Sequence, residues 1–449
     1  MSTIEKHDMT QGKILLPLVS FTIPLVLGNL FQLTYNAADS VIVGKYVGEQ
    51  ALAAVGTSTP IMNIAILLIS GMCMGASVLM SSQYGAKDYD TLSRQISTTM
   101  LAGCGFSVVF SLLMLLLANP VLRLIRVPET AIPEAAAYLR IIFMGLIFTF
   151  MYNFLANTMR ALGDSKTPLY FLVTSAFLNI FGDLFFVVVL RWGVAGSAIA
   201  TVCSEGLCCL LCGIYIKKKI PLLCLGKKWW VFDKSLLGKT VSYGSTSAMQ
   251  QVCLQLGKLI IQSVVNTQGV AVMAAFTAVN RVDDFAYTPH QNIGHAMTTF
   301  LAQNKGAGHK ERMKKGFQTG LLIELVYSIG LFCVIWGLAP QIMTLFAEDG
   351  DAQVVSLGIS YLHLISWMYI LPGLTNGVQG FFRGIGDLKV TLYSTFMNMF
   401  GRVVAVFVMI RLLQMEFASL AWANMVGWIV MLLFEVPLLV KSMRNGECG

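Results

Sequence analysis

Charged residues are scarce in this chain of 449 residues: Asp, Glu, Lys and Arg make up 12% of it, whereas hydrophobic residues make up 56%. A soluble chain carries about 25% charged residues. A chain this poor in charge cannot cover a water-facing surface, so the composition excludes a soluble globular protein and a disordered one. A polytopic helical membrane protein is the class that remains.

A metal-binding cysteine pattern is also lacking. The chain has ten cysteines, and four of them crowd one apolar segment at positions 203, 208, 209 and 212. No CxxC pair is matched by a second pair or by histidines, which structural metal sites require. We interpret these cysteines as small residues of membrane helices. We expect no cofactor, no metal beyond a transported ion, and no enzymatic reaction, because no catalytic set of residues gathers in the sequence.

The apolar residues form long continuous runs. A membrane-spanning helix needs about 20 mostly apolar residues, and continuous runs of that length exclude the alternating strands of a membrane barrel. The sequence therefore predicts an all-α polytopic membrane protein with twelve transmembrane helices. They are expected at residues 14–41, 51–83, 96–118, 134–158, 168–190, 194–216, 240–265, 270–302, 316–338, 354–380, 390–412 and 417–440.

The positions of Lys and Arg predict the orientation. If both termini face the cytoplasm, the segments between spans on that side hold 22 basic residues and the opposite segments hold five. Cytoplasmic loops of membrane proteins carry the excess of Lys and Arg. We therefore expect a multi-pass protein of the plasma membrane with cytoplasmic termini. The net charge of +8 belongs to those loops and does not indicate nucleic acid.

The two halves of the chain resemble each other. Arg160-Ala-Leu-Gly-Asp-Ser-Lys166 recurs as Arg383-Gly-Ile-Gly-Asp-Leu-Lys389, with further matches in the same order. Each half holds six spans, an even number, so both halves enter the membrane in the same direction. This predicts two parallel six-helix repeats, residues 1–225 and 226–449, related by an axis along the membrane normal. Such repeats favour a transporter that works by alternating access.

Ionisable residues within the predicted spans are candidates for function, because charge at membrane depth is costly. Asp39 lies late in the first span, and Asp183 lies in the fifth, one helical turn after Asn179. Counting 1.5 Å per residue, Thr201 of the sixth span reaches the level of Asp183. Two carboxylates, an amide and a hydroxyl predict a cation site that suits Na⁺ or a shared proton. The alternative is a set of unconnected, internally paired polar residues.

The second half does not repeat this site. Its seventh span has no carboxylate and offers Gln255 at the comparable depth, and Arg402 stands where Asp183 stands in the first half. Asp283 and Asp284 either pair with Arg281 or face a substrate cavity together with Gln255 and Arg402. His290 and His295 are expected to be hydrogen-bonded core residues.

The sequence resembles the multidrug and toxic compound extrusion (MATE) transporters of bacteria. The resemblance rests on Asn36-Ala-Ala-Asp39-Ser-Val-Ile-Val-Gly44, Ala51-Leu-Ala-Ala-Val-Gly56, Gln83-Tyr-Gly85 and Arg160-Ala-Leu-Gly-Asp164, and it covers essentially the whole chain. It implies a V-shaped bundle of two lobes that exports amphipathic, often cationic compounds in exchange for H⁺ or Na⁺. It also implies a cation site in the N-terminal lobe at Asp39, Asn179, Asp183 and Thr201, and a bend of the first helix at Pro24.

Two functions follow from these patterns. The first is a secondary active antiporter whose partners are small-molecule drugs or metabolites and membrane lipid, acting as a monomer. The alternative is a flippase for lipid-linked precursors from the same wider superfamily. A flippase would favour a cationic cavity for phosphate and often has fourteen spans, so twelve spans and the acidic pair Asp39 and Asp183 favour the antiporter.

Overall fold

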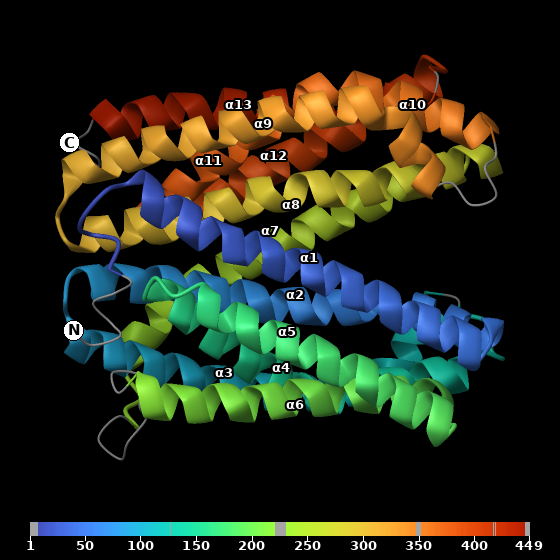
Figure 1. Cartoon of the computed structure of the whole chain (residues 1–449), viewed down its shortest axis with the longest axis horizontal. Coiled ribbons are helices and arrows are strands. Elements are labelled where there is room, and N and C mark those ends of the chain that lie inside the picture. The colour runs from blue at the N-terminus through green and yellow to red at the C-terminus, as the bar shows by residue number, and fades with distance from the viewer. Residues whose placement is uncertain are drawn as a thin grey trace. The chain divides into compact units, whose positions relative to one another are not determined.

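A computed structural model describes residues 8–125, 127–220, 230–346, 352–415, 417 and 419–444. Helices form nearly all of this described part, which contains no β-strand (Figure 1). The all-α class predicted from the composition is therefore confirmed.

Thirteen α-helices and three shorter helical segments follow one another along the described chain. The α-helices are α1 (Leu15–Tyr46), α2 (Glu49–Gly85), α3 (Tyr89–Leu124), α4 (Ile132–Ala161), α5 (Lys166–Asp183), α6 (Gly193–Lys219), α7 (Lys234–Val265), α8 (Val270–Gly306), α9 (Lys310–Phe346), α10 (Ala352–Ser366), α11 (Ile370–Ile385), α12 (Leu388–Phe407) and α13 (Ser419–Arg444).

The shorter segments join or extend these helices. A π-helix, η2 (Leu184–Val189), continues α5, and a second, η7 (Val408–Leu412), continues α12. A 3₁₀ turn, η6 (Trp367–Tyr369), joins α10 to α11. The described residues therefore contain twelve continuous helical rods, and each coincides with one of the twelve predicted runs.

Ten of the rods in the described part are long and apolar enough to cross a membrane. The other two, α7 and α8, are long enough, with 32 and 37 residues. They are more polar, and α8 carries Arg281, Asp283, Asp284 and His290 within its length. A helix of 32 residues is about 48 Å long, which exceeds a hydrocarbon core of about 30 Å.

The chain divides into two compact units. The first comprises Met1–Asp8 and Ile23–Ala248, and the second comprises Met9–Thr22 and Met249–Gly449. The change of unit within α1 falls between Thr22 and Ile23, directly before Ile23 and Pro24, the proline inside that helix. The predicted division at residues 225 and 226 lies among residues 221–229, outside the described residues, and stays a prediction.

In the first unit α4 is central, because it packs against α2, α3 and α6. In the second unit α8 packs against α9, α10 and α11, and α12 packs against α13. Small residues permit the closest approaches. A Cβ atom added to Gly75 of α2 would collide with the backbone of Tyr243 in α7, so only glycine allows these two helices to meet there.

The repeated motif forms the same turn in both units. Gly163 and Gly386 adopt left-handed backbone angles, with φ of 90° and 86°, which glycine tolerates at a helix end. Oδ1 of Asp164 then accepts hydrogen bonds from the backbone of Lys166 and Thr167 at 3.1 and 3.0 Å. Asp387 takes the N-cap position of α12 without a capping bond.

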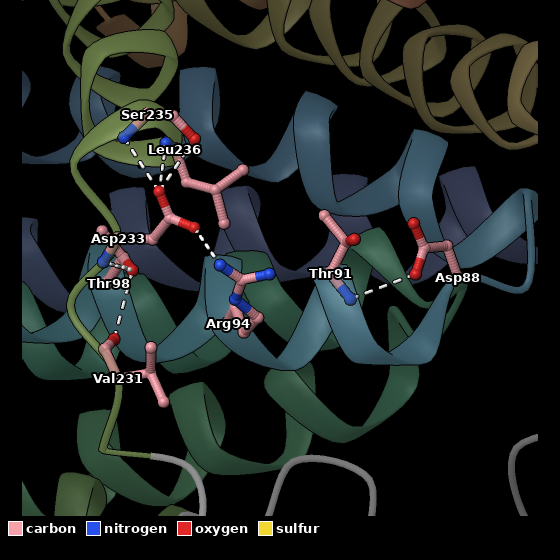
Figure 2. A network of polar contacts seen from close by, with 8 residues as sticks. All are labelled: Asp88, Thr91, Arg94, Thr98, Val231, Asp233, Ser235 and Leu236. Carbon is pink, nitrogen blue, oxygen red and sulfur yellow. Dashed lines mark hydrogen bonds and ion pairs between the residues drawn. The ribbon is translucent and has the colours of Figure 1, made fainter.

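A polar network holds the start of α7 against α3 (Figure 2). Asp233 forms an ion pair with Arg94, and its Oδ1 accepts hydrogen bonds from the backbone of Ser235 and Leu236 at 2.8 and 3.3 Å. The hydroxyl of Ser235 donates to the same oxygen at 2.8 Å. These bonds, from the Ser235 side chain first, lower the pKa of Asp233.

Candidate ion-coupling site

One face of α6 carries polar side chains at three successive turns. Ser197, Thr201 and Glu205 are spaced four residues apart, and residues at this spacing lie one above the other on a helix. Each of the three contacts a different neighbouring helix. We call these three residues the α6 ladder.

The first contact of the ladder joins α6 to α1. The Ser197 hydroxyl donates to Oδ1 of Asp39 at 2.7 Å. Ser197 is completely buried and Asp39 is partly buried, so this bond is partly shielded from water. A hydrogen bond to a charged acceptor in such a place is stronger than one between neutral groups.

The second contact joins α6 to α5. Nδ2 of Asn179 donates to the Thr201 hydroxyl at 3.1 Å, and that hydroxyl donates to the backbone oxygen of Ser197 at 3.2 Å. Asp183, one turn after Asn179, is the last residue of α5 before the π-helix η2 begins. The backbone hydrogen-bonding pattern of this rod therefore changes directly after Asp183.

The oxygens of Asn179 and Asp183 point into the protein without donors. Asn179 is 2% exposed and Asp183 is fully buried. Oδ1 of Asn179 and both carboxyl oxygens of Asp183 accept no hydrogen bond from an amide or from a Ser, Thr or Tyr hydroxyl of the described residues. The carboxyl of Asp39 lies directly against that of Asp183. Buried acceptors without donors are costly, and a cation or a shared proton is what would satisfy them.

The four residues predicted from the sequence therefore lie together in the first unit. Two carboxyls, one amide and one hydroxyl supply the oxygen atoms that a hard cation such as Na⁺ prefers. The same two adjacent carboxyls are able to share one proton.

Four further residues at this site were not predicted from the sequence. Ser197 is one, and Glu205 is another, with its Oε2 accepting a hydrogen bond from the Thr149 hydroxyl at 2.5 Å. Tyr35 and Tyr138 are the others, and both interact electrostatically with Asp39 and with Glu205. The i+4 spacing from Thr201 would have identified Ser197 and Glu205.

The acidic residues of α8 have partners of their own in the second unit. Asp283 is 4% exposed and accepts hydrogen bonds from the hydroxyls of Tyr361 and Tyr369 at 3.0 and 2.5 Å. Asp284 is half exposed and pairs with Lys258 at 3.1 Å. The structure therefore gives these acids partners other than Arg281. A cavity role for Asp283, Asp284, Gln255 and Arg402 stays a prediction.

The histidines of α8 are hydrogen-bonded, in line with the sequence analysis. Nδ1 of His290 lies 2.6 Å from Oε2 of Glu324, and both side chains are buried. Nδ1 of His295 lies 3.4 Å from a guanidinium nitrogen of Arg383. Arg383 also donates to Oε1 of Gln379 at 2.6 Å. The described residues hold no cluster of three or more His, Cys, Asp and Glu able to bind a metal.

Known proteins resemble this chain over nearly its whole length. The MatE family model matches residues 24–185 and 247–409. The chain belongs to the MATE family. Its members are transporters and not enzymes, so the chain is a multi-pass membrane transporter of the multidrug efflux class.

The MATE relatives include two bacterial proteins. A probable multidrug resistance protein, YpnP of Bacillus subtilis, is 32% identical over 392 residues, which cover 87% of this chain and 86% of YpnP. The probable multidrug resistance protein NorM of Thermotoga maritima is 23% identical over 423 residues, which cover 92% of this chain and 89% of NorM. The structure of an outward-facing multidrug resistance MATE transporter of the MOP superfamily has the same fold, with a TM-score of 0.91 and 22% identity. The match covers 100% of this chain and 99% of that transporter.

Proposed function

We propose that this MATE transporter is a secondary active antiporter that exports amphipathic, often cationic small molecules in exchange for H⁺ or Na⁺. The observation that carries the proposal is the completely buried Asp183 carboxyl, which accepts no hydrogen bond from an amide or from a Ser, Thr or Tyr hydroxyl of the described residues and lies against the carboxyl of Asp39. Two adjacent carboxylates repel each other unless a cation or proton joins them. Ion binding at Asp39, Asn179, Asp183 and Thr201 is therefore the step that a transmembrane gradient drives.

Ion binding would act directly on α1. Asp39 lies on α1, whereas Asn179 and Asp183 lie on α5 and Thr201 lies on α6. An ion held by all of them draws α1 toward the other two helices. Pro24 interrupts the backbone hydrogen bonding of α1, close to the point where α1 passes between units. We propose that α1 bends there when the ion binds.

The substrates proposed for this chain are inferred from its relatives. The names of these relatives concern multidrug resistance, which supports small-molecule drugs or metabolites as substrates and not lipid-linked precursors. We propose that the protein works as a monomer in the plasma membrane with its termini on the cytoplasmic side, because the basic loops favour that orientation. Cysteine labelling from outside intact cells should then reach Gln268→Cys, between α7 and α8, and not Lys310→Cys at the start of α9.

Transport by the purified protein tests the function. The protein is reconstituted into proteoliposomes with a fluorescent cationic dye, and Na⁺ and H⁺ gradients are imposed separately with the membrane potential clamped. We expect one of the two gradients to drive dye movement against its concentration. Dye movement that responds to neither gradient would refute the antiporter, and movement of lipid-linked precursor alone would support the flippase.

A further inference from the structure

We propose that His290 and Glu324 form a proton-binding site in the second unit, and that Nε2 of His290 is the atom at which the proton enters and leaves. The ligand is H⁺, exchanged with water. This site shares no residue with the candidate ion-coupling site of the first unit. It therefore goes beyond the proposed function and holds whichever ion drives export.

The two side chains are in direct contact near the middle of their helices. Nδ1 of His290 lies 2.6 Å from Oε2 of Glu324, and the side chains are 0% and 1% exposed. His290 is about 24 Å along α8 from its last residue, Gly306, and Glu324 is about 21 Å along α9 from its first residue, Lys310. A net charge at such a depth is costly, so the contact favours a pair that is neutral as a whole.

Neighbouring groups hold the imidazole ring of His290 in place. The ring of Tyr327 packs edge-on against it with 4.7 Å between centroids, and the Tyr327 hydroxyl donates to the backbone oxygen of Ala286 at 3.1 Å. On α11, a Cβ atom added to Gly373 would lie 3.2 Å from Cε1 and 3.3 Å from Nδ1 of His290. The ring therefore keeps Nδ1 toward Glu324.

Other titratable groups lie near the pair without bonding to it. Within two turns of His290, Glu324 or Gly373, their helices carry Asp283, Asp284, Tyr287, His295, Tyr327 and Tyr369. Asp283 is bonded to two tyrosines, Asp284 pairs with Lys258, and His295 lies against Arg383. Within the described part of the chain, the ion contact of His290 and that of Glu324 is with each other.

The hydrogen count of the pair identifies Nε2 as the exchanging atom. A neutral pair has one hydrogen between Nδ1 and Oε2 and one on Nε2, both for an acid beside an imidazole and for a carboxylate beside an imidazolium. Yet Nε2 of His290 makes no hydrogen bond with the nitrogen atoms, hydroxyls or carbonyls of the described residues. A buried donor without an acceptor is costly. Loss of this hydrogen removes that cost but leaves Glu324 ionised, so each protonation state has one unfavourable feature.

Proton release involves both nitrogen atoms of the ring. Nε2 gives its proton to a water molecule, while the carboxyl hydrogen of Glu324 passes from Oε2 to Nδ1. His290 stays neutral with its hydrogen on Nδ1, Glu324 becomes a carboxylate that accepts the Nδ1–H bond, and the water becomes hydronium. Uptake is the reverse of these steps.

Infrared spectra of the purified protein in lipid vesicles test proton binding directly, because they record the carbonyl stretch of protonated carboxyl groups. We expect the wild type to lose the band of Glu324 as the pH is raised from about 4 to about 10. Glu324→Gln should lack this band, since glutamine keeps the shape of the side chain but has no acid. Glu435→Gln is the matched control, because it removes another fully buried carboxyl of the second unit and should leave the Glu324 band in place.

The rate of exchange tests the role of Nε2. His290→Asn places an amide near the position of Nδ1 and removes Nε2, so a contact with Glu324 remains while the exchanging atom is lost. After a rapid change of pH, we expect the Glu324 band to respond about tenfold or more slowly than in the wild type, as for the loss of a positioned proton-transfer group. Ser328→Ala, which removes a hydroxyl bonded to the backbone of Glu324 at 2.8 Å, should keep the wild-type rate.

Three results would overturn the proposal: a Glu324 band that stays unchanged over the whole pH range, identical spectra for the wild type and Glu324→Gln, or a wild-type exchange rate in His290→Asn. If Glu324→Gln does not fold, Glu324→Asp decides in its place, because it keeps the acid and should shift the frequency of the same band. The spectra need neither dye nor an ion gradient, so their outcome is independent of the antiport proposed above.

Discussion

Ser197 and Asp39 are 158 residues apart in the sequence, and the Ser197 hydroxyl donates to the Asp39 carboxyl at 2.7 Å. This bond fixes the end of α1 against α6 at the level where Asp183 reaches in from α5. Three helices therefore hold the two acids together. None of these contacts is local, so only the folded first unit creates the site.

The Ser197–Asp39 bond can be tested by removing its donor. Ser197→Ala leaves the partly buried Asp39 with one hydrogen bond fewer, and a bond to a charged group contributes about 1.5–3 kcal/mol. We expect the half-saturating concentration of the driving cation to shift about tenfold or more in dye-export assays. Thr174→Ala is the control, because its hydroxyl only donates to the backbone of Tyr170 at 2.8 Å. An unchanged half-saturating concentration would show that Ser197 does not hold Asp39 for ion binding.

The glycine contact between α2 and α7 predicts a stability change. A Cβ atom on Gly75 would collide with the Tyr243 backbone, whereas one on Gly105 of α3 meets nothing within 4 Å. Overpacking of this kind costs about 1–3 kcal/mol. We expect Gly75→Ala to lower the melting temperature of the detergent-solubilised protein and Gly105→Ala to leave it equal or higher. Equal melting temperatures for both variants would mean that α2 and α7 are not this close.

The cap at the start of α7 predicts a pH dependence. Asp233 has a lowered pKa because it accepts bonds from Ser235 and Leu236 and pairs with Arg94. Its stabilising effect is complete above the unfolded pKa of about 3.9 and is lost as the pH falls through the lower folded pKa. Asp233→Ala should therefore lower the melting temperature at pH 7.

The difference between Asp233→Ala and the wild type should shrink as the pH is taken below about 4. Thermal unfolding at a series of pH values measures it. A difference that stays constant down to the most acidic pH would show that the ionised carboxyl is not what stabilises α7.

The bend proposed for α1 can be tested separately from the stability of the protein. Pro24→Ala restores a backbone hydrogen bond in the helix interior, where proline costs about 3 kcal/mol. We expect a folded protein that binds dye but exports it several times more slowly, because a straight α1 is favoured. Pro17→Ala is the control, since Pro17 lies in the first turn of α1, where proline replaces no hydrogen bond. Normal export rates in Pro24→Ala would show that α1 need not bend.

Much of the fold is predictable from the sequence because the membrane imposes it. A bilayer leaves no partner for backbone groups outside a helix, so each apolar run predicts one rod. The repeat also appears in the sequence, because the turns at Gly163 and Gly386 need the same residues. The breaks at Trp367–Tyr369 and Leu184–Val189 are not predictable, since neither segment contains a proline or a glycine that would signal a break in the sequence.

The candidate site is predictable only in part. Asp39 and Asp183 stand out because acids are rare in apolar spans. Ser197 and Thr149 do not, because serine and threonine are common in membrane helices and usually bond their own backbone, as Thr174 does. The partners of Asp283 are tyrosines of α10 and η6, and nothing local in the sequence connects them to α8.

The most direct test of the account is gradient-driven export by Asp183→Asn in proteoliposomes. Asparagine keeps the shape of the side chain, so the protein should fold and bind dye, but no carboxyl group remains on α5 to complete the pair with Asp39. Gln255→Ala in α7 is the control and should cost far less. We predict that Asp183→Asn loses export under both Na⁺ and H⁺ gradients while dye affinity persists. Full export by Asp183→Asn under either gradient would contradict it.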